Sequence, residues 1–168
     1  MLDQEIQDAA RRLLDLCKAR GLTVATAESC TGGLVIGALT EIAGSSAVVD
    51  RGFVTYTNEA KQEMLDVHAA TLRRHGAVSR ETAEAMARGV LERTKVALAV
   101  SVTGIAGPSG GSVEKPVGLV HFAAADRDGQ LIHQERRYGD VGRSVIRRQS
   151  VMQALAMLQQ LAEGYPEA

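Results

Sequence analysis

The sequence contains no tryptophan, and its 168 residues include only two phenylalanines and three tyrosines. Single-stranded nucleic acids bind to proteins by stacking their bases on aromatic side chains, and this chain has few of them. It also lacks an excess of positive charge, because 19 basic residues stand against 20 acidic ones. A basic surface is the usual mark of a nucleic-acid-binding protein. Both deficits argue against nucleic acid as a partner.

Long apolar runs are also missing, and no stretch approaches the ~20 residues that a membrane-spanning helix needs. The first 20 residues, MLDQEIQDAARRLLDLCKAR, are interrupted by charges, which favours an amphipathic helix over a signal peptide. We therefore expect a cytoplasmic protein that does not contact the membrane.

Cysteine is scarce, and Cys17 and Cys30 show neither the spacing of metal ligands nor an evident disulfide framework. The four histidines likewise match no metal-binding motif. The sequence thus predicts neither a metal site nor a cofactor.

The length predicts a single domain over residues 1–168, with residues 164–168 as a loose tail. Apolar periodicity and capping residues predict helices at 2–20, 30–42, 59–65, 69–75, 80–93 and 143–162. Apolar runs between turn residues predict strands at 22–27, 47–57, 95–104, 117–125 and 130–138. A bulge or bend is expected at Asp50–Gly52.

Strands of this kind, nearly continuous in apolar residues and mixed with helices, are typical of an α/β fold. The prediction is a mainly parallel sheet with helices on both faces. Ligands of such sheets bind beyond the carboxyl ends of the strands. The loops that follow Ala27, Tyr56 and Val102 should therefore meet at one site.

The stretch TAESCTGG joins a predicted strand to a predicted helix, and it places Ser29 at the junction. A hydroxyl there could meet free N–H groups and the positive end of the helix, where an oxyanion or phosphate would be stabilised. Ser29 or Thr31 could equally be a simple N-cap. The neighbouring Cys30 could be a thiol nucleophile activated by the helix start, or merely a small buried residue.

Lys61 is predicted at the third position of a helix capped by Asn58, where the helix dipole disfavours a positive charge. A lysine that is also partly buried there shifts toward the neutral amine, which can act as a base. Tyr56, at the end of the preceding strand, could share the same pocket. An exposed lysine and a half-buried tyrosine are the alternative.

The loop TGIAGPSGGS (103–112) holds four glycines, so its backbone N–H groups could bind a phosphate or a sugar. It matches neither the dinucleotide-binding fingerprint nor a Walker A loop, and a flexible connection is equally consistent with it. Arg143 opens the last helix and offers the fork that binds phosphate or carboxylate. Arg147 and Arg148, by contrast, are predicted to be surface charges.

Four motifs in this order, AESCTGG, GSSAVVDRGFVTYTNEAK, HGAVS and VSVTGIAGPSGGSVEKPVGLV, closely resemble the C-terminal domain of the competence/damage-inducible CinA proteins. The resemblance extends from about residue 6 to about residue 161. Short stand-alone versions of that domain are nicotinamide-nucleotide amidohydrolases. Since no pyrophosphatase-like domain precedes the motifs here, the chain resembles the stand-alone form.

The resemblance implies a three-layer α/β/α domain with a mixed sheet of five or six strands. It also implies hydrolysis of the carboxamide of nicotinamide mononucleotide (NMN) to nicotinate mononucleotide and ammonia, with a serine and a lysine and without a metal. The catalytic residues that it implies are Ser29, Lys61, Tyr56 and Ser46. The substrate-binding residues are Thr31, Gly32, Thr103, Gly104, Gly107 and Arg143.

In this hypothesis neutral Lys61 takes the serine proton, directly or through Tyr56. The N–H groups at the start of the 30–42 helix, with Thr103 nearby, stabilise the oxyanion. Ser29 is the favoured nucleophile, and Ser46 is a relay or the rival nucleophile.

A different enzyme on the same site, such as an amidase for another pyridine compound, is the first alternative. The second is a regulatory module that binds a nucleotide without turnover. A scaffolding role in DNA uptake is the weakest. The expected partners are a small-molecule substrate and other copies of the chain in a homo-oligomer.

Overall fold

The computed structural model describes residues 2–167 of the chain. Within these residues, five strands form a sheet in the order β2-β1-β3-β4-β5. The strands are β1 (Val24–Glu28), β2 (Val49–Val54), β3 (Leu98–Gly104), β4 (Leu119–Asp126) and β5 (Leu131–Arg137). Strand β1 pairs in parallel with β2 and β3, whereas β4 pairs antiparallel with β3 and β5.

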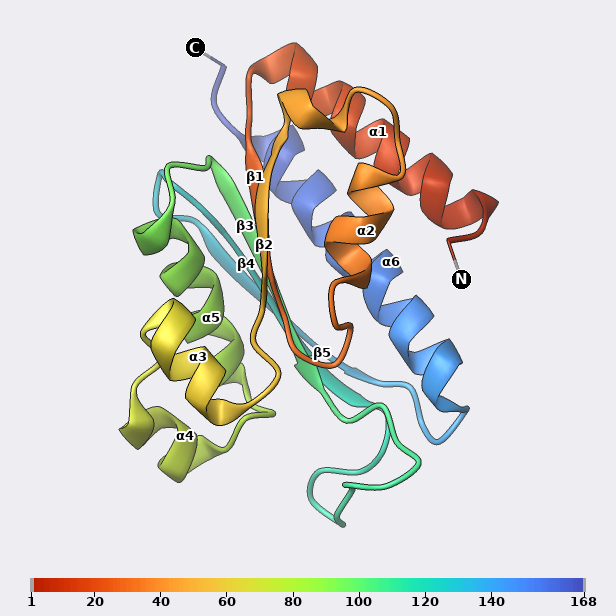
Figure 1. Cartoon of the computed structure of the whole chain (residues 1–168), viewed down its shortest axis with the longest axis vertical. Coiled ribbons are helices and arrows are strands. Elements are labelled where there is room, and N and C mark those ends of the chain that lie inside the picture. The colour runs from red at the N-terminus through yellow and green to blue at the C-terminus, as the bar shows by residue number, and fades with distance from the viewer. Residues whose placement is uncertain (1, 168) are drawn as a thin grey trace.

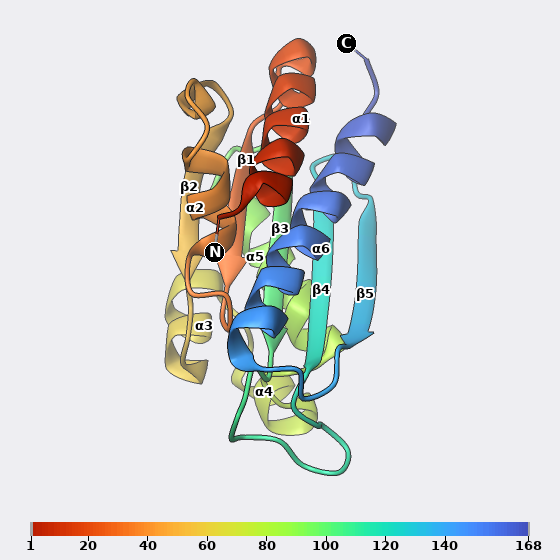
Figure 2. The same ribbon diagram turned by 90° about the vertical axis from the view of Figure 1, so that its right-hand side faces the viewer.

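Helices cover both faces of the sheet (Figures 1 and 2). One face carries α1 (Gln4–Arg20), α2 (Leu34–Thr40) and α6 (Arg143–Gly164). The other carries α3 (Asn58–Leu65), α4 (Ala69–His75) and α5 (Arg80–Arg93). This arrangement confirms the predicted three-layer α/β/α fold. None of the described helices is long and apolar enough to cross a lipid bilayer.

The core follows from the position of each strand in the sheet. The central strands β1 and β4 are buried along their whole length, and β3 is buried up to its last residue, whereas the edge strands β2 and β5 are largely exposed or half-buried. Side chains of α1, α2 and α6 pack on one face in the larger core cluster. Because the central strands are covered on both faces, their sequences are nearly continuous in apolar residues.

The sheet is mixed, as predicted, but parallel pairs make up two of its four pairings rather than the majority. The tight turn over Asp126–Gly129 joins β4 and β5 in an antiparallel hairpin, as its sequence predicts. Strand β4 also pairs antiparallel with β3, because no crossover helix separates these two strands in the chain. The predicted bulge is present in β2. Val24 pairs with Val49 and Ala25 with Arg51, so Asp50 is left without a partner in β1.

Most predicted boundaries differ from the observed ones by up to three residues, and two differences bear on the site and on the predicted tail. Helix α2 begins at Leu34 rather than at residue 30, because Gly32 and Gly33 adopt positive φ angles of 57° and 98° and keep the chain in a turn. Helix α6 extends to Gly164, so the predicted loose tail begins inside it. Beyond the helix, Arg20 donates to the carbonyl oxygen of Tyr165 at 3.0 Å. Residue 168 lies outside the described residues.

Gly89 of α5 allows α3 to approach closely, and its replacement tests this packing. A Cβ atom at residue 89 would lie 2.2 Å from the carbonyl oxygen of Leu65, whereas one at Gly37 of α2 would meet nothing within 4 Å. We expect Gly89→Ala to lower the free energy of unfolding by about 1–3 kcal/mol through overpacking. Gly37→Ala should raise it by up to about 1 kcal/mol, because alanine favours the helix.

Urea denaturation of the two variants and the wild type measures both effects. Equal stability changes in the two variants would show that α3 is not held against Gly89 as described.

Candidate active site

A cavity of about 200 Å³ lies at the carboxyl ends of the parallel strands β1, β2 and β3. The loops that follow these strands meet there, as the sequence predicted. The cavity is lined by Ser29, Cys30, Tyr56, Lys61, Ala77, Val78, Thr103, Gly104, Ala106 and Arg143.

Ser29 and Lys61 are in direct contact in this cavity. The Lys61 amine lies 3.0 Å from the Ser29 hydroxyl oxygen, and it also donates to the carbonyl oxygens of Thr55 at 2.8 Å and Tyr56 at 3.3 Å. The backbone N–H of Ser29 donates to the carbonyl oxygen of Val102 at 2.9 Å, which extends the β1–β3 ladder by one residue. The fold therefore fixes the serine backbone on one side and the lysine amine on the other.

Lys61 is fully buried, and none of the ion pairs formed within residues 2–167 includes it. Burial disfavours the charged form and lowers the pKa of Lys61 to about 8. The helix is capped by Thr57 rather than by Asn58, so Lys61 is its fourth residue and not its third. Desolvation, more than the helix start, thus makes the amine available as a base.

Tyr56 is 58% exposed, and its phenol lies at the mouth of the cavity. Its hydroxyl accepts a hydrogen bond from Arg143 at 3.2 Å, and Arg143 also donates to the carbonyl oxygen of Gly107 at 2.9 Å. Ser29 and Lys61 contact only the backbone carbonyl of Tyr56. The geometry consequently favours direct proton transfer between the two side chains over a relay through the phenol.

Thr103 and Gly104 line the cavity, as the resemblance implied. The Thr103 hydroxyl donates to the carbonyl oxygen of Ala77 at 2.7 Å. Its proton is therefore already engaged, and the residue holds the segment of Ala77 and Val78 against the end of β3.

Four residues implied by the resemblance do not line the cavity, namely Ser46, Thr31, Gly32 and Gly107. Gly107 lies next to it, where its carbonyl oxygen accepts from Arg143. Ser46 is exposed in the short 3₁₀ helix Ser45–Ala47, which precedes β2. Because β1 and β2 are parallel, the start of β2 and the end of β1 lie at opposite edges of the sheet, so Ser46 is remote from Ser29. Thr31 is buried inside the turn, and Gly32 lies beside Arg147.

Cys30 lines the cavity but is poorly suited to be a nucleophile. Burial raises the pKa of its thiol to about 12, so the reactive thiolate is scarce at neutral pH. The predicted activation by a helix start is absent, since α2 begins four residues later.

Two charged residues beside Ser29 escaped the sequence prediction. Glu28, the last residue of β1, is fully buried, and its carboxylate receives hydrogen bonds from the start of α2. Arg147 is half-buried and donates to the carbonyl oxygens of Cys30 and Thr31, although it was predicted to be a surface charge. A carboxylate at the end of an apolar strand was the available signal for Glu28, because a buried charge requires several donors.

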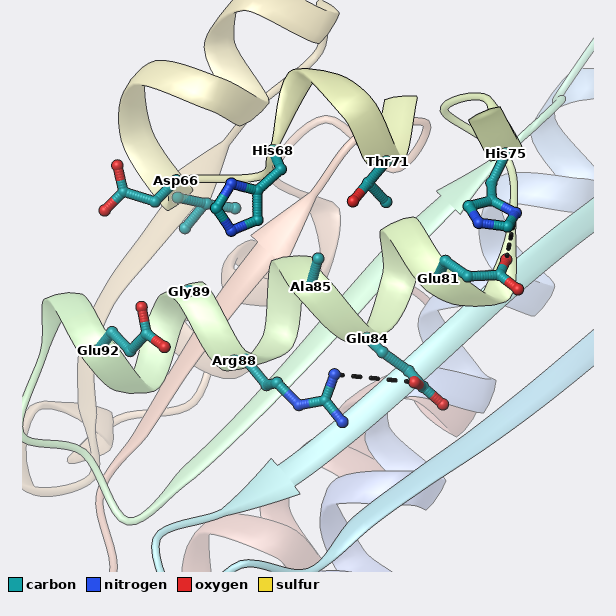
Figure 3. Close-up of a pocket in the computed structure, with 11 residues that line it drawn as sticks. Asp66, His68, Thr71, His75, Glu81, Glu84, Ala85, Arg88, Gly89 and Glu92 are labelled. Carbon is teal, nitrogen blue, oxygen red and sulfur yellow. Dashed lines mark ion pairs between the residues drawn. The ribbon is translucent and has the colours of Figure 1, made fainter. Parts of the chain in front are cut away.

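A second, larger cavity of about 400 Å³ lies between α5 and the segment of α3 and α4. Figure 3 shows two ionic contacts among the side chains that line it: His75 lies 3.6 Å from Glu81, and Arg88 lies 3.9 Å from Glu84. No cluster of three or more metal-ligating side chains occurs in the part of the chain that the structure describes. This cavity is lined by no serine and no lysine, so the smaller cavity is the candidate active site.

A serine hydroxyl held against a buried lysine amine is an arrangement used in nucleophilic catalysis. The model of one family, the CinA C-terminal domain, matches residues 6–162. The chain thus belongs to the CinA C-terminal domain family.

Curated relatives and solved structures agree with this assignment. The chain is 50% identical to the nicotinamide-nucleotide amidohydrolase PncC of Escherichia coli strain K12, over 95% of this chain and 96% of the relative. A putative competence-damage inducible protein of Caldanaerobacter subterraneus is 46% identical over 96% of this chain, which spans only 38% of that protein.

Among solved structures, the competence/damage inducible protein CihA of Agrobacterium tumefaciens superposes with a TM-score of 0.94 at 60% identity. The alignment covers 96% of this chain and 98% of that one.

The state of the two thiols provides a test of the cavity's chemistry. Burial raises the pKa of Cys17 to about 11 and that of Cys30 to about 12. We expect neither to react with iodoacetamide at pH 7.5 within the time that labels glutathione fully, and both to react after unfolding. Rapid alkylation of Cys30 in the folded protein, located by peptide mass spectrometry, would contradict the protonated thiol.

Proposed function

We propose that this protein hydrolyses the carboxamide of NMN to nicotinate mononucleotide and ammonia. The observation that carries the proposal is the 3.0 Å contact between the Ser29 hydroxyl and the buried amine of Lys61. The likeness to relatives named nicotinamide-nucleotide amidohydrolase supplies the substrate. The predicted cytoplasmic location and homo-oligomer remain predictions.

The reaction begins when neutral Lys61 removes the proton of the Ser29 hydroxyl. The serine oxygen then attacks the carboxamide carbon and forms a tetrahedral intermediate. Protonated Lys61 returns the proton to the amide nitrogen, the C–N bond breaks, and ammonia leaves. In the second half, Lys61 takes a proton from water, the resulting hydroxide cleaves the ester, and the proton returns to Ser29.

The negative oxygen of the tetrahedral intermediate needs donors close to Ser29. The first N–H groups of α2 do not serve, because those of Val35 and Ile36 donate to Glu28. The N–H of Cys30 follows the nucleophile directly and donates to no oxygen within residues 2–167. We assign the oxyanion contact to this group, which replaces the predicted role of a helix start.

The phosphate and ribose of NMN would bind at the mouth of the cavity. Arg143 lies there between Tyr56 and the glycine-rich loop, and its guanidinium can exchange its contact with the Tyr56 hydroxyl for a phosphate. Thr103 and Gly104 would shape the floor for the sugar, and the Gly107 carbonyl oxygen would hold Arg143 in place. The binding energy of the phosphate and ribose, gained away from the reacting group, orients the carboxamide over Ser29.

Ammonia release from NMN tests the proposal and separates the two candidate serines. We expect turnover by the wild type in the presence of EDTA, because both proton transfers use Lys61 and no metal. Ser29→Ala and Lys61→Met should lower kcat by roughly three orders of magnitude or more. Ser46→Ala, the matched control, should retain the wild-type kcat.

Full activity in Ser29→Ala would contradict the assignment of the nucleophile. Binding of NMN by the wild type without ammonia release would favour a nucleotide-binding regulatory module instead.

The pH dependence of kcat/KM should report the base. Because burial lowers the pKa of Lys61 to about 8 and only the neutral amine accepts a proton, kcat/KM should rise with pH. It should level off above about pH 8. A stopped assay from pH 6 to pH 9.5 measures this rise of kcat/KM with pH. A plateau already reached at pH 6.5 would exclude Lys61 as the base.

A further inference from the structure

The Glu28 carboxylate lies directly under the turn that presents Ser29, and it accepts four hydrogen bonds. One oxygen, Oε1, accepts from the Thr31 hydroxyl at 2.7 Å and the Val35 N–H at 2.9 Å. The other, Oε2, accepts from the Thr26 hydroxyl at 3.1 Å and the Ile36 N–H at 3.0 Å. Every donor comes from the strand before Ser29 or from the turn and helix after it.

These bonds connect three segments through one buried side chain. Glu28 is itself the last residue of β1, so it links the strand to α2 and to the turn that carries Ser29. The first N–H groups of a helix need acceptors, and Glu28 supplies them in place of an N-cap side chain, since the cap residue is Gly33. The direction of Ser29 from the end of β1 therefore depends on this carboxylate.

Arg147 of helix α6 also holds the turn that carries Ser29. Its Nε donates to the carbonyl oxygen of Cys30 at 3.1 Å, and its Nη2 donates to that of Thr31 at 3.3 Å. The guanidinium thereby fixes two successive peptide groups after Ser29, and it does so from α6, one helical turn after Arg143. The N–H of Cys30 belongs to the peptide that immediately precedes these two.

We propose that Glu28 and Arg147 are positioning residues, which together hold the Ser29 hydroxyl within hydrogen-bond distance of Lys61. Neither side chain lines the cavity, so neither touches the substrate in this assignment. The expected changes in kcat rest on the proposed amidohydrolase function. The expected change in the contact between Ser29 and Lys61 does not.

The contacts explain why a carboxylate, and not its isosteric amide, is required at residue 28. Each carboxylate oxygen accepts from one backbone N–H, that of Val35 or that of Ile36. A glutamine has only one oxygen, so in either orientation its NH₂ group faces one of these two donors. The threonine hydroxyls can rotate to adapt, whereas the backbone N–H groups cannot. Glu28→Gln should thus shift the turn while conserving the volume of the side chain.

The first test compares Glu28→Gln with Glu41→Gln, the same chemical change at the other end of α2. At a temperature where both variants are fully folded, we expect Glu28→Gln to lower kcat on the order of a hundredfold, with a smaller change in KM. Glu41→Gln should match the wild type. A loss that disappears when kcat is expressed per folded molecule, measured by circular dichroism and active-site titration, would show a merely structural role and overturn the proposal.

The second test uses neighbouring arginines of α6. Arg147→Ala should lose activity, and added guanidinium chloride at millimolar concentration should restore part of it by occupying the vacated position. Arg148 forms ion pairs with Asp3 and Glu5 on the surface, so Arg148→Ala should keep its activity and show no response to guanidinium. Equal activity of the two variants would overturn the role of Arg147.

A crystal structure of Glu28→Gln distinguishes failure of this inference from failure of the proposed function. We expect an intact fold in which the Ser29 hydroxyl lies beyond hydrogen-bond distance of the Lys61 amine. That result would support the positioning role even if the wild type released no ammonia from NMN. An unchanged contact between Ser29 and Lys61 would overturn the role, whatever the substrate.

Discussion

The burial of the Lys61 amine against the Ser29 hydroxyl is the constraint on which the rest of the site depends. An ammonium group without a carboxylate partner is unfavourable in the interior, and here it has only a hydroxyl and two carbonyl oxygens as acceptors. The protein lessens this cost by lowering the pKa of the lysine, which is also what makes the amine a base near neutral pH. Stability and chemistry are thus set by the same interaction.

The fold provides this contact by bringing together segments that are distant in sequence. Ser29 follows β1, Lys61 follows β2 on α3, and Thr103 lies at the end of β3. The parallel pairing of β1 with both neighbours places these strand ends at one edge, and the helix after β2 carries the lysine back over it. Helix α6 then contributes two arginines to the same edge, one at the mouth of the cavity and one beneath the serine turn.

Much of this was predictable from the sequence, because it depends on patterns with a direct physical cause. Apolar strands between helices predicted the α/β layers, and the rule that ligands bind at strand ends located the site near Ser29, Tyr56 and Thr103. The start of α2 was not predictable in the same way. The prediction extended the helix back over Gly32 and Gly33, whereas the positive φ angles of these glycines and the acceptors supplied by Glu28 set the first turn at Leu34. Contacts over more than one hundred residues, such as that of Arg147 with the Cys30 carbonyl, leave no local pattern at all.

The position of Ser46 illustrates the same limit, since its motif lies close to Ser29 in sequence but the topology places it at the opposite edge of the sheet.

The most direct test of the account is the pKa of Lys61 itself, measured by NMR titration of protein labelled with ¹³C and ¹⁵N in its lysines. The Lys61 signal is assigned by comparison with Lys61→Arg. The account predicts a midpoint near 8, well below the ordinary lysine value of 10.5. A Lys61 signal that titrates near 10.5 would mean that the amine is hydrated like that of an exposed lysine, so that its neutral form is scarce until about pH 10. It would contradict a buried base beside Ser29.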